Sequence, residues 1–221
     1  MSDKFFAAVR KMAGGKLPQA QVDHLNRILS ATAAMPISHR AYILATAWHE
    51  TGQFKWLREI WGPTAAQKRY EGRADLGNTV TGDGKRFMGR GYVHITGRAN
   101  YADWGRRLGL DLLGKPELAE RPEIAARILV EGMRLGTFTK YKLSDYLPGD
   151  YINARRIVNG QDKASLIAGY AKAFEAALSA SGNPAGAAVD GADTFKQIAA
   201  DRPGFWAGLL QIIWAMLGKR K

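Results

Sequence analysis

The stretch 38–61 constrains the fold most strongly, because it joins an apolar helix pattern to two carboxylates. Ser38 is of the type that caps helix N-termini. Apolar side chains one and two turns before Glu50 place that residue on the same stripe of a helix. Gly52 is a typical helix stop. We therefore predict a helix that begins at Ser38 and presents Glu50 at the end of its apolar face.

Glu59 lies nine positions beyond Glu50, after the expected turn. A carboxyl in apolar surroundings has a raised pKa and can keep its proton, whereas a better hydrated one stays ionised. Two carboxylates in unlike environments suit acid/base hydrolysis of a glycoside. The alternative is that Glu50 is an ordinary solvated residue at a helix end, although Trp48 and His49 beside it favour a functional role.

Helical spacing recurs along most of the chain, which predicts a mainly α fold. The longest interruption, 62–90, is rich in Gly and charge, and we predict a long structured loop there. We expect its carboxylates, and those of the surrounding helices, to make loop hydrogen bonds or to be solvated. The other expected helices cover 3–13, 18–34, 101–108, 122–136, 151–158 and 165–180. The helix over 165–180 carries an apolar stripe at four-residue spacing, formed by Leu166, Tyr170, Phe174 and Leu178.

The chain has 221 residues, no Cys and a net charge of +12. This length can bury a substantial core, and the absence of Cys excludes a disulfide framework and thiolate metal sites. The positive charge favours an anionic partner such as nucleic acid, anionic lipid or an acidic bacterial wall. No DNA-binding motif is recognisable, so we expect no nucleic acid. His49 and Glu50 lack the second His of the helical zinc motif, so we expect no metal.

Composition changes after residue 180, which predicts a domain over 1–180, a small-residue linker over 181–193 and a C-terminal segment over 194–221. Within that segment, 204–218 is almost wholly apolar and is followed by three basic residues. It is short for a membrane span, which takes about 20 residues. We expect contact with a membrane or the outer envelope through 204–221; the alternative is a helix packed on the domain or on a second copy.

A second notable stretch, 89–101, places a short segment over 92–96 that we expect to be extended. Hydroxyl and amide groups follow at Thr96, Asn100 and Tyr101, and such neutral groups suit sugar hydroxyls or a positioned water.

Together these stretches resemble the glycoside hydrolase family 19 (chitinase-like) domain of phage and prophage endolysins. The resemblance covers about residues 38–178. The matching segments, in chain order, are His49 to Gly52, Leu57 to Glu59, Tyr70 to Arg73, Leu76 to Asn78, Gly82 to Gly84, Gly89 to Tyr101, Pro116 to Leu118 and Ile157 to Gly160.

The resemblance implies a lysozyme-like, two-lobed helical domain with a central cleft and an inverting mechanism without a cofactor. Glu50 matches the general acid and Glu59 the general base, with the carboxyl groups about 6.5–9.5 Å apart to admit a water. Thr96 matches a position that helps to hold this water. Asn100 and Asn159 match positions that bind substrate or support the cleft. His94 stands where the family commonly has Gln, and Gln53 where a second Gly is common.

We expect a peptidoglycan-degrading endolysin, with His94 and Tyr101 also binding the glycan strand. Chitinase activity and a catalytically silent wall-binding module are the alternatives, and the choice between muramidase and glucosaminidase stays open. The N-terminus lacks a standard secretory signal. We therefore expect synthesis in a bacterial host cytoplasm, action at the wall or periplasm, and a monomer.

Overall fold

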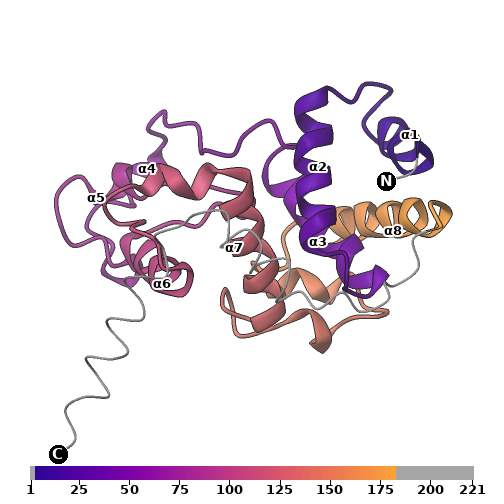
Figure 1. Ribbon diagram of the computed structural model, residues 1–221. Coiled ribbons are helices and arrows are strands. Elements are labelled where there is room, and N and C mark those ends of the chain that lie inside the picture. The colour runs from indigo at the N-terminus through magenta and orange to yellow at the C-terminus, as the bar shows by residue number, and fades with distance from the viewer. Residues whose placement is uncertain (1–2, 183–221) are drawn as a thin grey trace, which may run out of the picture.

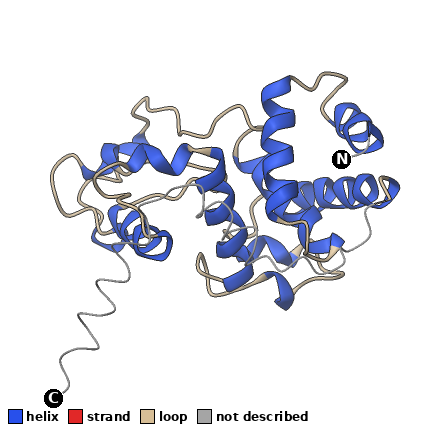
Figure 2. Cartoon of the chain, viewed as in Figure 1, coloured by secondary structure: helices blue, strands red, loops and turns tan. Residues whose placement is uncertain are grey.

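The computed structural model describes residues 3–182, which consist of helices and loops without a named strand (Figures 1 and 2). This confirms the predicted mainly α class. No helix in that range is long and apolar enough to cross a membrane. Beyond its first two residues the predicted linker 181–193 lies outside the described residues, as does the C-terminal segment 194–221. The elements are α1 Asp3–Met12, α2 Gln19–Ala31, α3 Ile37–Glu50, α4 Ala65–Lys68, η1 Ala74–Leu76, α5 Asp83–Arg86, α6 Arg98–Leu108, η2 Pro116–Glu120, α7 Pro122–Leu135, η3 Leu143–Asp145, η4 Asn153–Ile157 and α8 Ala164–Ala180.

Helix α3 lies at the centre of the larger lobe, where it packs most extensively on α8, and α1 covers α8 from the other side. Every residue from Ala41 to Trp48 is buried. The sequence pattern predicted one apolar stripe, but α3 is surrounded by protein over most of its length. A helix apolar on all sides belongs in a core, so the end of α3 is held rigidly.

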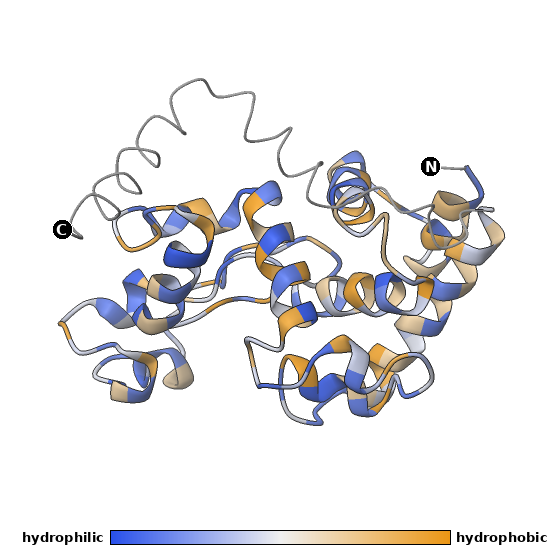
Figure 3. Ribbon diagram, turned by 60° about the horizontal axis from the view of Figure 1, so that its bottom comes forward, coloured by the Kyte–Doolittle hydropathy of each residue, from blue (hydrophilic) through white to orange (hydrophobic). Residues whose placement is uncertain are grey.

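Helix α7 stands between the larger lobe and the smaller one that holds α4, α5 and α6 (Figure 1). Its Leu129 and Met133 belong to the core of the larger lobe. Ile124 and Ile128 belong to a second apolar cluster built over α6. One amphipathic helix thus supplies buried side chains to both lobes; Figure 3 shows how hydrophilic and hydrophobic residues share the helices.

The predicted loop 62–90 is ordered by one-turn helices and by its own carboxylates. Glu71 accepts hydrogen bonds from the backbone of Gly82 and Gly84, and Asp83 pairs with Arg98. Phe87 at its end is fully buried. The loop carboxylates therefore have the structural role that the sequence predicted for them.

The predicted stripe on α8 is wrong in its first part, because Leu166 is 46% exposed whereas Phe174 and Leu178 are buried. Residues four apart drift by about 40° around a helix at each step. The true core face instead includes Ile167 and its small neighbours. Leu135, the last residue of α7, is also exposed.

Three local predictions also need correction. Helix α3 begins at Ile37 with Pro36 at the N-cap position, so Ser38 is a buried residue of the first turn and not a cap. The segment 92–96 is a tight turn, since Gly91 and His94 have positive φ. The segment 151–158 forms the short 3₁₀ helix η4 in place of an α-helix.

Candidate active site

Glu50 is the last residue of α3, and the helix stops there for a local reason. The Thr51 hydroxyl donates to the carbonyl of Ala47 at 2.6 Å and accepts a hydrogen bond from Phe54 N at 2.8 Å. Gly52 then turns the chain with φ of +56°. This side-chain cap satisfies backbone groups that the helix end leaves unpaired. The Glu50 side chain consequently projects from a rigid terminus and is 19% exposed.

A buried guanidinium faces Glu50. Arg155 Nη1 donates to Glu50 Oε1 at 2.5 Å, and Arg155 Nε donates to the carbonyl of Asp162 at 3.0 Å. Arg155 is only 4% exposed. Glu50 therefore lies beside a buried charge, and the expected apolar surroundings of its carboxyl are wrong. The signal was missed because the partner lies on η4, far along the chain.

Helix η4 is held in place by Asp150, whose carboxylate accepts hydrogen bonds from the backbone and side-chain amides of Asn153. These bonds lower the pKa of Asp150. An Asp that binds the backbone two or three residues on is a common starter of a turn. Arg155 lies two residues beyond Asn153 on the same short helix, and its guanidinium reaches Glu50 at the end of α3.

Two neighbouring side chains are kept neutral by burial. Desolvation lowers the pKa of His49, against an opposing effect of Glu50. Burial also raises the pKa of Tyr42, which stacks in parallel on Tyr151. Neither group therefore adds a charge beside the Glu50–Arg155 pair at neutral pH.

Glu59 is positioned by backbone pairing between the segments 57–59 and 89–91. Glu59 N donates to Gly89 O at 2.9 Å, and Gly91 N donates to Leu57 O at 2.8 Å. An isolated antiparallel bridge joins the same two segments. This short pairing, and not a helix, fixes the backbone of the second carboxylate.

The Glu59 carboxylate accepts hydrogen bonds from three neutral donors. Oε1 accepts from Gln67 Nε2 at 2.9 Å and from the Tyr70 hydroxyl at 3.3 Å, and Oε2 accepts from Gly89 N at 3.1 Å. Desolvation raises the pKa of Tyr70, and the charge of Glu59 adds to this shift. Glu59 is thus surrounded by dipoles, whereas Glu50 is paired with a full charge.

Sequence reasoning missed Gln67, although a signal was present. Thr64 and Gln67 stand at the spacing of a capping box, and both of its hydrogen bonds are made: Gln67 N donates to Thr64 Oγ1, and Thr64 N donates to Gln67 Oε1. Gln67 is 3% exposed. The pattern could have been recognised, but its contact with Glu59 could not.

The predicted residues His94, Thr96 and Asn100 form a line of hydrogen bonds that begins beside the end of α3. Trp56 N donates to Thr51 O at 3.0 Å, and Trp56 O lies 2.9 Å from His94 Nε2. The Thr96 hydroxyl donates to His94 O, and Asn100 Nδ2 donates to Thr96 O. The structure brings these three residues together, and Asn100 is exposed.

Tyr101 is fully buried, which is incompatible with a direct contact between its ring and a glycan. Its hydroxyl donates to Met88 O at 2.7 Å and accepts from Arg90 Nη1 at 2.9 Å. Arg90 in turn pairs with Glu120. The prediction that Tyr101 binds substrate is therefore corrected: its ring packs in the smaller lobe, where it orders the turn before His94.

Asn159 is exposed and lies one helical turn beyond Arg155, to whose carbonyl its N–H donates at 3.1 Å. Its Oδ1 accepts a hydrogen bond from Gly160 N. The residue is thus close in sequence and space to the partner of Glu50, and its substrate-binding role stays a prediction.

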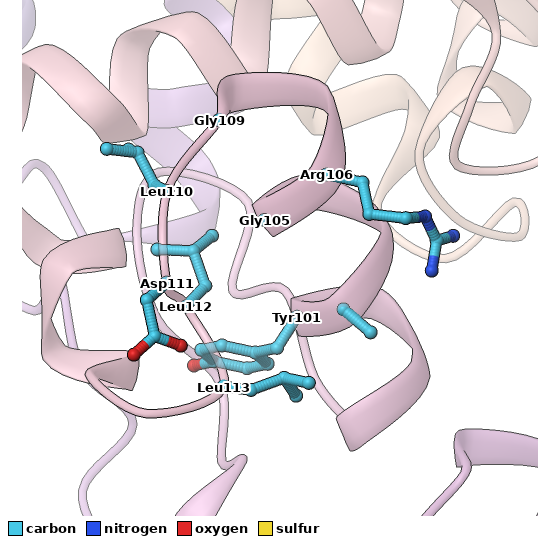
Figure 4. A pocket seen from close by; sticks show the side chains of 9 residues that line it. Tyr101, Gly105, Arg106, Gly109, Leu110, Asp111, Leu112 and Leu113 are labelled. Atoms are coloured by element: carbon cyan, nitrogen blue, oxygen red, sulfur yellow. The ribbon is translucent and has the colours of Figure 1, made fainter. Parts of the chain in front are cut away.

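A cavity of about 380 Å³ lies elsewhere, between α6 and the segment 109–113 (Figure 4). It is mainly apolar, with Leu110, Leu112 and Leu113 in its lining. Neither Glu50 nor Glu59 lines it, so it is separate from the candidate site. Among the described residues, no group of three or more His, Cys, Asp or Glu is arranged to hold a metal ion.

The described residues form a helical fold in which Glu50 and Glu59 have unlike surroundings, and comparison with known proteins shows what this fold is similar to. No family model matches the chain. It is 38% identical over 90 residues to an endochitinase of Arabidopsis thaliana, which covers 39% of this chain and 32% of the relative. It is 30% identical over 137 residues to a basic endochitinase of Brassica napus, with coverage of 58% and 49%. A glycosyl hydrolase family 19 domain-containing protein of Haemophilus influenzae is 30% identical over 100 residues, with coverage of 33% and 50%. The chain spans at most half the length of these curated relatives.

Solved structures show the same fold. Chitinase C from Streptomyces griseus matches with a TM-score of 0.56 at 18% identity, over 85% of this chain and 81% of that one. A bacterial family 19 chitinase matches with a TM-score of 0.50 at 18% identity, over 78% and 93%. The chain therefore has the lysozyme-like helical fold of these chitinases, and its relatives support the predicted family 19 resemblance.

Proposed function

We propose that the protein is a glycoside hydrolase that cleaves β-1,4 bonds between amino sugars with inversion, using Glu50 as general acid and Glu59 as general base. The observation that carries this proposal is the contrast between the two carboxylates. Glu50 is paired with buried Arg155, whereas Glu59 is held by neutral donors. Unlike environments separate acid and base roles in such enzymes; which carboxylate has which role is taken from the family 19 resemblance.

In the proposed reaction, Glu50 gives its proton to the glycosidic oxygen as the bond to the anomeric carbon breaks. Glu50 is then a carboxylate, and Arg155 stabilises it through a charge-assisted hydrogen bond. The ion pair with Arg155 is the arrangement that this mechanism requires after proton transfer. Arg155 thereby favours donation, and the acid must be reprotonated from water before the next turnover.

Glu59 takes a proton from the water that attacks the anomeric carbon from the opposite face. Its neutral donors fix the carboxylate while leaving it able to accept that proton. In this mechanism Thr96 helps to hold the water, while His94, Asn100 and Asn159 bind the sugar or support its binding. Inversion calls for about 6.5–9.5 Å between the two carboxyl groups.

Peptidoglycan is the substrate that we favour, because a net charge of +12 suits an anionic wall. In this proposal the protein is a phage or prophage endolysin that acts as a monomer at the wall, with 204–221 contacting the envelope. Chitin is the second candidate, and the names of the relatives favour it: two are endochitinases, and the structural neighbours are chitinases.

The test compares release of dye from labelled peptidoglycan sacculi with cleavage of a soluble chitin hexamer. We expect Glu50→Gln and Glu59→Gln each to lose about 10²–10⁴-fold in kcat on the cleaved substrate, the range typical of acid/base groups. Glu123→Gln, which alters an exposed carboxylate on α7, is the control and should keep wild-type activity.

Proton NMR of the first products should show the α-anomer from the β-linked substrate. A β-anomer product would contradict inversion. Cleavage of chitin without release from sacculi would contradict the choice of peptidoglycan. Wall binding without any cleavage, unchanged by Glu50→Gln, would indicate a silent binding module.

A further inference from the structure

The side chain of Gln67 is one of the most constrained polar groups beside the candidate site. Its Oε1 accepts hydrogen bonds from Thr64 N at 2.8 Å and Gly62 N at 3.1 Å. Its Nε2 donates to Ile60 O at 2.8 Å and to Glu59 Oε1 at 2.9 Å. All four hydrogen-bonding positions of the amide are therefore occupied.

This arrangement fixes which end of the amide faces Glu59. Two backbone N–H groups point at Oε1, and a flipped amide would turn its NH₂ group against them. It would also place its carbonyl oxygen against the carbonyl of Ile60 and the carboxylate of Glu59. Since an unmade hydrogen bond at a buried polar group costs about 1–3 kcal/mol, the N–H toward Glu59 is held in place by the local fold.

The two oxygens of Glu59 are used differently. Within residues 3–182, Oε1 accepts from both Gln67 and Tyr70, whereas Oε2 accepts from Gly89 N alone. Each carboxylate oxygen has about two acceptor positions. Oε1 is thus saturated, and Oε2 retains an unused one.

We propose that Gln67 is a positioning residue for Glu59: its amide N–H saturates Oε1, so that Oε2 takes the proton from the attacking water. The inference rests on the proposed function, in which Glu59 is the general base. Gln67 itself touches no reacting atom. It acts by fixing the rotation of the carboxylate, so that Oε2 is the oxygen left with an unused acceptor position.

The test is the pH dependence of kcat/KM on labelled sacculi and on the chitin hexamer. Gln67→Glu places a second carboxyl against Oε1, and like charges in one site raise one of their pKa values. We expect the acidic limb of the profile to move to higher pH by about 1–3 units. Gln67→Met removes the N–H without adding charge. It should lower kcat about 10-fold with little change in KM.

The chain offers a matched control in Gln19, whose Nε2 donates to Asp23 Oδ1 at 2.8 Å on the exposed face of α2. Gln19→Glu makes the same chemical change beside a carboxylate outside the site, and its pH profile should be that of the wild type. Thermal unfolding of each variant separates folding from activity. A purely structural Gln67 would lower activity equally at every pH.

An unmoved acidic limb in folded Gln67→Glu would overturn the inference. If that variant does not fold, wild-type kcat in Gln67→Met would overturn it, whereas the expected loss at constant KM would support it. Glu59→Gln distinguishes a failure of the inference about Gln67 from a failure of the proposed function of Glu59. If Glu59→Gln is inactive while the Gln67 variants keep the wild-type profile, only the role of Gln67 fails. If Glu59→Gln stays fully active, the proposed base itself is wrong.

Discussion

Arg155 Nη1 lies 2.5 Å from Oε1 of Glu50, although the two residues are 105 positions apart. Arg155 also donates to the carbonyl of Asp162 just before α8, so its guanidinium ties η4 to the loop that precedes α8 and to the end of α3. A contact between a buried cation and a half-buried carboxylate is strong because little water screens it. It follows that the end of α3 and the C-terminal third of the domain depend on one another.

Arg155→Met tests this dependence. Hydrogen bonds to charged groups contribute about 1.5–3 kcal/mol, so we expect kcat for the cleaved glycan to fall roughly 10–100-fold. Arg156→Met is the control, because Arg156 is the exposed neighbour on η4. Steady-state kinetics and thermal unfolding check both variants. Equal activities in the two variants would show that Arg155 does not assist Glu50.

Gly89→Ala tests how closely the backbone must approach Glu59. A Cβ at Gly89 would lie 3.0 Å from His94 Cβ and 3.3 Å from Glu59 Oε2, both tighter than ordinary contact. Overpacking costs about 1–3 kcal/mol, and Glu59 would be displaced. We expect kcat to fall about 10-fold or more. Gly160→Ala meets no atom within 4 Å and should leave kcat unchanged, as an activity assay of both variants would show.

Asp83→Asn tests the buried ion pair below α6. Arg98 holds the pKa of Asp83 below its usual range, helped by the backbone N–H of Val80. A lowered folded-state pKa adds stability that is present above the unfolded value of about 3.9 and is lost as pH falls through the folded value. We expect Asp83→Asn to cost about 1.5–3 kcal/mol at neutral pH, with a smaller difference in strong acid.

Urea unfolding across the acidic range measures this difference. Asp75→Asn is the matched control, because Asp75 pairs with Arg73 on the surface, where ion pairs contribute little. A cost for Asp83→Asn that stays constant down to strongly acidic pH would contradict the assigned ion pair.

His24→Gln tests the contribution of a half-buried His to pH stability. His24 Nδ1 lies 2.8 Å from the Tyr92 hydroxyl, and its ring stacks on Phe54. Burial lowers the pKa of His24, and Asp23 only partly opposes this. The unfolded chain thus takes up a proton near pH 6.5 before the folded chain does, and stability falls as pH drops from there through the lowered folded value.

We therefore expect His24→Gln to reduce the loss of stability between about pH 7.5 and 5. Denaturant unfolding at both ends of this range checks the prediction. A wild-type slope in the variant would show that His24 contributes nothing to it. His39 and His49, whose pKa values are also lowered by burial, should continue to contribute to this loss.

The sequence predicted most of the α-helices correctly, because apolar spacing and helix stops depend on residues that are close together in the chain. The end of α3 before Gly52 follows from turn chemistry. Contacts across the chain were beyond such patterns. No residue near Arg155 in the sequence indicates its contact with Glu50. Likewise, no residue near Gln67 indicates its hydrogen bond to Glu59. The prediction that Tyr101 binds substrate was wrong for a related reason, since its burial depends on the packing of the smaller lobe.

Helix α7 has a consequence for the whole molecule, because Leu129 and Ile128 are neighbours in sequence but belong to different apolar clusters. The apolar core of each lobe is therefore completed by side chains of α7. If the chain were divided into two fragments, the fragment without α7 would lose part of its apolar core. Apolar side chains that are buried in the whole domain would then be exposed to solvent in both fragments. We therefore expect the two lobes to fold together, because α7 contributes buried side chains to both of them.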